Sequence, residues 1–221
     1  MTSGRVTSAP GGNGAGRWRI RDGSQAELVV GAGLVAVVLV GGAVLRAWPA
    51  PDAIDHLVWH VVPSGQHTPL YTGMARLRAP AVAGGVAVVF LLTVGRNRWR
   101  ALACLVGPLL ALVLSELAVK PAVGRTLGGS LSYPSGSTVG AVVVATAAFL
   151  AAPRRLRPVV AVVALSYAGL MAVSVVATGS HYPTDALAGL AFGAGIMLLT
   201  DGALARAGRW WGPRREPAAP S

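Results

Sequence analysis

Residues 158–205 read PVVAVVALSYAGLMAVSVVATGSHYPTDALAGLAFGAGIMLLTDGALA, and this stretch decides the fold class. Two apolar runs, at about 158–178 and 185–205, are separated only by the short polar segment 179–184. Each run approaches the ~20 residues that a helix needs to cross about 30 Å of hydrocarbon. Because lipid offers no partners for backbone N–H and C=O groups, each run is expected to be a transmembrane helix.

Four more apolar runs precede this pair, at about 28–46, 79–95, 101–119 and 137–152. The 221 residues are 53% hydrophobic and only 12% charged, whereas soluble domains carry roughly 25% charged residues. This composition excludes a soluble globular domain. We therefore expect an all-α, polytopic membrane protein whose single domain, residues 27–206, has six transmembrane helices. The polar segments 1–26 and 207–221 are predicted to be disordered cytoplasmic tails.

Basic residues predict the orientation of these helices. The formal net charge is +11, but most arginines flank the apolar runs, which favours a role in topology over nucleic-acid binding. With six spans, 14 of the 19 Lys and Arg residues lie on one side, in the two tails, in the loops 96–100 and 154–157, and at Arg206, which directly precedes the second tail. The positive-inside rule makes that side cytoplasmic. We expect a multi-pass protein of the plasma membrane with both termini in the cytoplasm.

Polar groups suited to an anion gather at the outer ends of the predicted helices. The only lysine, Lys120, ends the third run, where a snorkelling role is also expected. A loop rich in glycine and hydroxyl groups, 128–138, leads into the fourth run. Helix N-termini bind anions, although such a loop also suits ordinary capping. His181 and Asp185 are four residues apart and share a helical face, so the carboxylate can orient the imidazole or merely cap the helix.

At these residues the chain resembles the type-2 phosphatidic acid phosphatase superfamily. Its membrane members have six helices and three outward-facing motifs, Lys-x6-Arg-Pro, Pro-Ser-Gly-His and Ser-Arg-x5-His-x3-Asp. Seven of the eleven motif positions match, namely Lys120, Pro134, Ser135, Gly136, Ser174, His181 and Asp185. The motifs cover residues 120–185, and the apolar runs extend the likeness over about 28–205.

The resemblance implies a lipid phosphatase whose active site faces outward and needs no cofactor or metal. In this comparison His181 is the nucleophile that becomes phosphohistidine, and Asp185 orients it. The phosphate binders implied are Lys120, Ser135 and Gly136, with Ser137 beside them and Arg125 as a substitute chosen by proximity. The expected partners are a lipid phosphate or diphosphate and the membrane lipids, and the oligomeric state is left open.

Four positions depart from the superfamily pattern, namely Leu127, Gly128, Ser137 and Val175. Ser137 replaces the histidine that protonates the leaving oxygen, a role worth about 10²–10⁴-fold in rate. An alkoxide needs that proton, whereas a phosphate group, with a second pKa of about 6, can leave a diphosphate without it. The sequence therefore predicts reduced or absent activity, and a preference for lipid diphosphates such as a polyprenyl diphosphate over monoesters.

Other interpretations stay open from sequence. One is a catalytically impaired relative that binds lipid phosphate or a membrane partner, and a more remote one is an unrelated transporter or channel. The outer-segment histidines His56, His60 and His67 could replace the missing acid, and His56 and His60 have a spacing that also suits metal ligands. Glu116, one turn before Lys120, is expected to pair with Lys120 or Arg125 inside the bundle.

Overall fold

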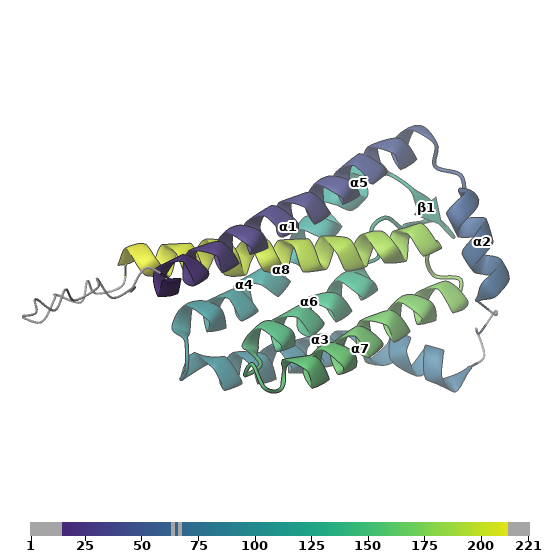
Figure 1. Ribbon diagram of the computed structural model, residues 1–221. Coiled ribbons are helices and arrows are strands. Elements are labelled where there is room, and N and C mark those ends of the chain that lie inside the picture. The colour runs from purple at the N-terminus through teal and green to yellow at the C-terminus, as the bar shows by residue number, and fades with distance from the viewer. Residues whose placement is uncertain (1–14, 63–64, 66–67, 212–221) are drawn as a thin grey trace, which may run out of the picture.

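The computed structural model describes residues 15–62, 65 and 68–211, and side chains within 24–210 of that range. The fold is all-helical apart from one small hairpin (Figure 1). Its elements are α1 (Ala15–Ala47), α2 (Ala53–Val61), α3 (Pro69–Val94), α4 (Arg98–Leu114), the π-helical segment η1 (Ser115–Val119), α5 (Lys120–Val123), β1 (Thr126–Leu127), β2 (Ser130–Leu131), α6 (Gly136–Ala151), α7 (Arg157–Ala177) and α8 (Pro183–Trp211).

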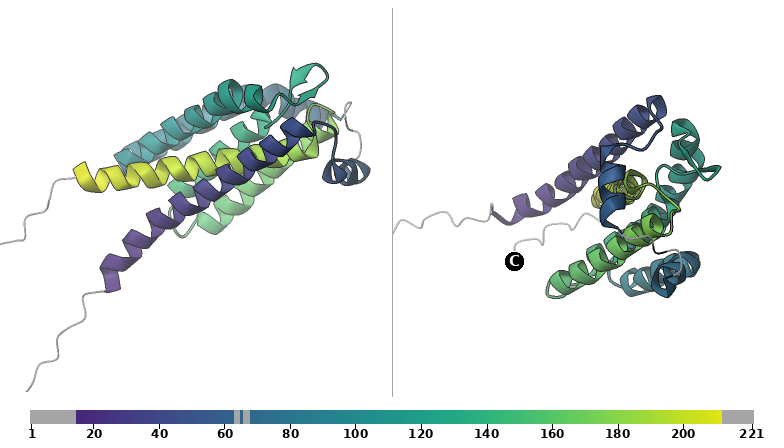
Figure 2. Two further views of the ribbon diagram at one scale, coloured as in Figure 1. Left: turned by 90° about the horizontal axis from the view of Figure 1, so that it is seen from above. Right: turned by 90° about the vertical axis from the view of Figure 1, so that its right-hand side faces the viewer.

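Helices α8 and α6 form the centre of the bundle. Helix α8 packs against α1, α4 and α6, and α6 packs in addition against α3 and α7 (Figures 1 and 2). Small residues permit this close packing, because lipid provides no hydrophobic drive for helices to associate. A Cβ atom at Gly31 of α1 would lie 2.8 Å from the carbonyl oxygen of Gly195 in α8, so glycine is required at that crossing.

Five helical stretches are long and apolar enough to cross a membrane: Ser24–Ala47, Pro69–Val94, Arg98–Val123, Arg157–Ala177 and Pro183–Trp210. The sixth expected span corresponds to α6, which has only 16 residues. At 1.5 Å per residue α6 is about 24 Å long, shorter than the ~30 Å hydrocarbon layer. The all-helical membrane architecture is confirmed, whereas the expected number of six spans is not.

Three helices begin or end outside the apolar runs that predict them. Helix α1 starts at Ala15 and α8 continues to Trp211, so parts of both segments expected to be disordered are helical, and the rest, 1–14 and 212–221, lies outside the described residues. Helix α3 starts at Pro69, ten residues before the run at 79–95. Proline suits the first helical turn, where its missing N–H costs nothing. As a consequence, Arg78 lies on a helix and not in an outer loop.

The third span changes its winding near its end. Between Ser115 and Val119 it forms a π-helical segment, and the N–H of Lys120 donates to the carbonyl of Ser115, five residues back. Such wide turns insert one extra residue into a helix and are frequent at functional sites. Glu116 and Lys120 lie in and directly after this turn, so it determines the direction in which both charged side chains point.

One end of the bundle carries the remaining short elements and is called the α2 end. It includes α2, the β1–β2 hairpin and the loops 124–135 and 178–182 (Figure 1). A capping box starts α2, in which Asp52 accepts from the N–H of Asp55 and Asp55 accepts from the N–H of Asp52. Ile54, Leu57 and Val61 are exposed on α2, whereas Asp55 is buried.

Candidate active site

Arg125 is at the centre of a buried ion-pair cluster at the α2 end. Its side chain has no exposed surface, and it forms ion pairs of 2.6 Å with Asp55 and 2.8 Å with Asp185. It also donates to the Thr184 hydroxyl at 2.7 Å and to the carbonyl of Pro49 at 3.1 Å. Burial would raise the pKa of Asp55, but hydrogen bonds from Thr184 and Arg125 lower it below its usual value.

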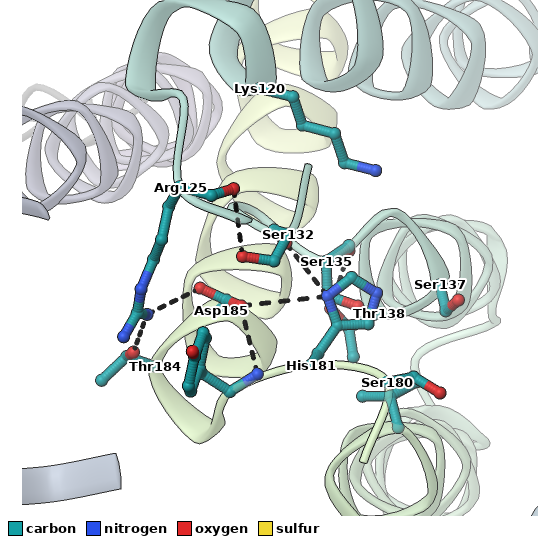
Figure 3. A network of polar contacts seen from close by, with 12 residues as sticks. Lys120, Arg125, Ser132, Ser135, Ser137, Thr138, Ser180, His181, Thr184 and Asp185 are labelled. Atoms are coloured by element: carbon teal, nitrogen blue, oxygen red, sulfur yellow. Dashed lines mark hydrogen bonds and ion pairs between the residues drawn. The ribbon is translucent and has the colours of Figure 1, made fainter. Parts of the chain in front are cut away.

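Arg125 was expected to bind phosphate, but in this cluster it contacts protein groups instead. Its guanidinium is enclosed by two carboxylates and stacks 3.9 Å from the Tyr182 ring, and it does not reach the cavity described below. Figure 3 shows Arg125 on one side of Asp185 and His181 on the other. The expectation that Arg125 substitutes for a phosphate-binding arginine is therefore corrected, because its donors are taken up by protein groups.

His181 lies in the loop between α7 and α8, with its side chain 12% exposed. Its Nδ1 is 3.0 Å from the carbonyl oxygen of Ser132 and 3.9 Å from Oδ2 of Asp185. A carbonyl oxygen only accepts, so Nδ1 carries the proton and Nε2 keeps its lone pair. Burial and the nearby Lys120 ammonium lower the pKa of His181 to about 4. The ring is neutral near pH 7, with Nε2 free to act as a nucleophile.

Asp185 supports the histidine loop more than the ring itself. Its carboxylate accepts from the N–H of Tyr182 at 3.1 Å and from Arg125, and its backbone carbonyl accepts from the N–H of Ser135 at 2.9 Å. The Asp185 residue thus connects the start of α8 with the start of α6. The imidazole is oriented instead by the hydrogen bond that its Nδ1 donates to the carbonyl of Ser132. Motif spacing alone did not indicate this contact.

Lys120 and Glu116 form a pair on the wall of the same site. The ammonium is 2.8 Å from Oε1 and 2.9 Å from Oε2 of Glu116, so the pairing expected from sequence is present with Lys120. The Lys120 side chain is 12% exposed and that of Glu116 is 47% exposed. A methyl group at Gly136 would collide with Oε1 of Glu116. The carboxylate therefore lies directly against the first residue of α6.

The serine turn before α6 supplies the third part of the site. Ser135 is buried, and its hydroxyl has no hydrogen-bond partner among the described residues. The Ser137 hydroxyl accepts from Arg78 of α3 at 3.0 Å. Ser174, the matching serine of the third motif, is buried in α7 and donates to the carbonyl of Leu170. Of these three serines, only Ser137 lines the cavity.

A cavity of about 690 Å³ brings the site residues together. Its polar end is formed by Arg78, Glu116, Lys120, Gly136, Ser137 and His181. The rest is an apolar arm between α3 and α4, lined by residues such as Val82, Val86, Leu105, Leu109 and Leu112. Leu105 precedes Lys120 by 15 residues, so the arm extends about 22 Å along the helix away from the polar end.

Arg78 is the residue that motif analysis missed. It is provided by α3, far from the three motifs, and it brings a second cation to the polar end beside Lys120. The signal that could have indicated it is Thr68-Pro69, a sequence typical of a helix start. A helix beginning there carries Arg78 into the bundle.

The family comparison agrees with this geometry. The family model described as the PAP2 superfamily matches residues 115–206. Over these 92 of its 221 residues the chain is similar to the PAP2 superfamily. The resemblance inferred from the motifs is thereby confirmed, and the match indicates a phosphatase-type activity on a phosphoester within a membrane protein. No curated protein and no solved structure matched the chain.

The PAP2 match includes Lys120, Ser135, Ser137, His181 and Asp185. It begins at residue 115 and therefore does not include Arg78. The metal alternative receives no support from the described residues, in which no group of three or more His, Cys, Asp or Glu side chains could hold an ion. His56 and His60 lie on α2 and do not line the cavity, and His67 falls outside the described residues.

Proposed function

We propose that the protein hydrolyses a lipid-linked phosphate or diphosphate at the outer face of the plasma membrane, through a phosphohistidine on His181. The observation that supports this most directly is the cavity, because one continuous space joins a cationic polar end to an apolar arm. Phosphate fits the cations and the α6 N-terminus, and a hydrocarbon chain fits the arm. Leu105 and Leu109, which line this arm, are exposed, so the arm is open and not enclosed.

In the first step Nε2 of His181 attacks phosphorus, the P–O bond to the leaving group breaks, and phosphohistidine forms. The Ser132 carbonyl holds the proton on Nδ1, and the depressed pKa of about 4 keeps the ring unprotonated beforehand. Lys120, Arg78 and Ser137 hold the phosphoryl oxygens, where charge stabilisation is usually the largest catalytic contribution. Water then attacks phosphorus, the P–N bond breaks, and inorganic phosphate is released.

Two expected phosphate binders keep indirect roles in this proposal. Gly136 begins α6 at the polar end of the cavity, and its lack of a side chain leaves room there for the carboxylate of Glu116. Ser135 contributes its position at the start of α6, and its unpartnered buried hydroxyl is available to a phosphate oxygen after a small movement. Asp185, through Arg125 and Tyr182, keeps the His181 loop in place.

The identity of residue 137 bears on the substrate. Arg78 donates to Ser137, and a serine at this position supplies no acid of suitable strength for an alkoxide leaving group. Because the phosphate leaving group of a diphosphate needs no proton, we propose that an isoprenyl diphosphate is hydrolysed faster than a phosphatidate. Faster release of phosphate from phosphatidate would contradict this preference.

The rival candidate is a relative that binds lipid phosphate without hydrolysing it, favoured by the absence of the motif arginines at 127 and 175 and of the histidine at 137. Phosphate release from lipid phosphates and diphosphates in detergent separates the two, with wild type compared with His181→Ala. We expect a loss of about 10³-fold or more, because a nucleophile is removed. His60→Ala, an exposed histidine on α2, is the matched control and should leave the rate unchanged. Equal rates for wild type and His181→Ala would favour the binding function.

A further inference from the structure

A carboxylate lies inside the proposed phosphate site, and neither the motifs nor the proposed mechanism uses it. Glu116 is the only acidic residue among the described residues that line the cavity. Its side chain is 47% exposed, in contrast to Asp55 and Asp185, which are fully buried on Arg125. An exposed carboxylate close to bound phosphate can exchange a proton with it.

The π-helical segment and α6 place this carboxylate beside the position of the missing acid. Oε1 of Glu116 abuts Gly136, and residue 137, the next along the chain, is where the superfamily has its proton-donating histidine. Glu116 is also close enough to His181 to affect its titration, as are Lys120 and Arg78. The carboxylate, the two cations and the imidazole therefore line the same cavity.

We propose that Glu116 is the general acid of this enzyme, a catalytic residue that takes over the role vacated at Ser137. This inference rests on the proposed function, because it assigns a step in the same hydrolysis. It goes beyond that function by assigning the proton donor for phosphate monoesters with poor leaving groups, and it predicts that the preference for diphosphates increases when Glu116 is replaced.

The protons balance over one cycle. A phosphate monoester has a second pKa of about 6 and brings a proton into the site in part of its population. Transfer of that proton to Glu116 leaves a dianion for Lys120 and Arg78 and removes the repulsion between two anions. When Nε2 of His181 attacks phosphorus and the P–O bond breaks, the Glu116 carboxylic acid protonates the leaving alkoxide and becomes a carboxylate. It then accepts a proton from the attacking water as the P–N bond breaks, and passes this proton to the released phosphate, so that Glu116 is again a carboxylate.

The charged and polar side chains that share the cavity with Glu116 come from four elements. Lys120 follows the same π-helical segment, Arg78 comes from α3, Ser137 from the start of α6, and His181 from the loop before α8. Three of them titrate or carry charge, so the pH profile alone would not identify the acid. The dependence of the rate on the leaving group identifies the acid, because loss of a general acid slows departure of a strongly basic leaving group more than departure of a weakly basic one.

The test therefore compares three substrates on wild type, Glu116→Gln and Glu116→Asp. Phosphatidate has an alkoxide leaving group that needs a proton, whereas 4-nitrophenyl phosphate and an isoprenyl diphosphate have leaving groups that do not. We expect Glu116→Gln to lower phosphatidate turnover by about 10²–10⁴-fold and the other two rates by less than about tenfold. Glu116→Asp keeps the charge beside Lys120 but withdraws the carboxylate by one methylene, so the phosphatidate rate should again fall selectively.

Each ratio of rates is taken within one preparation, so it does not depend on how much of a variant is folded. A selective loss on phosphatidate in both variants supports the inference. Equal changes on all three substrates would overturn it and leave Glu116 as the charge partner of Lys120. A wild-type protein that hydrolyses none of the substrates would instead overturn the proposed function, so the two failures are distinguishable.

Discussion

Two arginines at the same end of the bundle have opposite environments. Arg125 is fully buried, and protein carboxylates, a hydroxyl and backbone carbonyls accept its hydrogen bonds. Arg78 lines the cavity and, among the described residues, makes one side-chain hydrogen bond, to Ser137. A cation whose donors are all satisfied holds the fold together, and one with donors to spare can hold a ligand. Proximity to a motif in the sequence does not reveal which of the two an arginine will be.

The acidic residues at this end are likewise either buried in the Arg125 cluster or part of the cavity. Asp55 and Asp185 share Arg125 and have no exposed side-chain surface, so their removal from water is offset only while Arg125 is present. Glu116 pairs with Lys120 but remains accessible from the cavity. We therefore expect substitutions in the Arg125 cluster to affect mainly stability, and substitutions in the cavity to affect mainly turnover.

The largest effect is expected for Arg125→Met. This change leaves two buried carboxylates without their cation and should lower the free energy of unfolding by about 3–5 kcal/mol. Thermal unfolding in detergent, followed by circular dichroism, measures it. Arg125→Lys is the matched control, and it should recover only part of the loss because an ammonium cannot reproduce the planar fork of guanidinium. Unchanged unfolding of Arg125→Met would contradict the structural role.

Arg78→Gln should lower turnover and leave stability almost unchanged, the opposite of Arg125→Met. Removing one cation from the phosphate site should lower turnover by about 10²–10³-fold, with a change in unfolding free energy of less than about 0.5 kcal/mol. Phosphate release and thermal unfolding are measured on the same preparation. Arg76→Gln is the control, because Arg76 lies on the same helix but does not line the cavity. A similar loss in both variants would show that position 78 has no special role.

A smaller effect is expected at the start of α2, which carries Asp55 into the buried cluster. Asp52→Ala removes the side chain that caps this helix and should cost about 1 kcal/mol of unfolding free energy. Turnover should be unchanged at temperatures where the protein is folded, since Asp52 does not line the cavity. A loss of activity without loss of stability would mean that α2 acts on the site directly.

The smallest effect concerns the protonation of His181, which should not change between pH 6 and 8. Its pKa is lowered to about 4, so the neutral ring persists above that pH and the nucleophilic lone pair is lost only as pH falls through 4. Because the unfolded side chain titrates near 6.5, acid below that value also destabilises the fold. Histidine NMR, with His181→Ala to assign the signal, measures the titration, and a midpoint near 6.5 would contradict the buried environment.

The apolar runs predicted the positions of the long helices well, because a span must be apolar over most of its length. The motif spacing likewise predicted that Lys120, the turn at Ser135 to Ser137, and His181 come from separate helix ends at one face. The start of α3 was not predicted, because its first ten residues are helical through Pro69 and packing more than through hydrophobicity.

The roles of individual charges were harder to predict. Asp55 is 70 residues from Arg125 in the chain, and no local pattern indicates that the two meet in a buried pair. Glu116 and Arg78 reach the cavity through a π-helical turn and an interhelical contact, neither of which leaves a periodic signal in the sequence. Contacts within one motif could be anticipated, and contacts between distant segments required the folded structure.

The wide turn at Ser115–Val119 also separates two parts of one helix that differ in their rotation about the helix axis. Below it, the angular phase of α4 is fixed by neighbours in the membrane interior. Above it, the extra residue rotates everything that follows by about 100°, the angle between successive residues of a helix. Deleting the lipid-exposed Leu117 would let the helix close into regular turns. Helix α4 would keep its packing, while the ammonium of Lys120 would rotate away from the imidazole of His181. The number of residues in this one turn therefore determines the direction of the Lys120 side chain independently of how α4 packs.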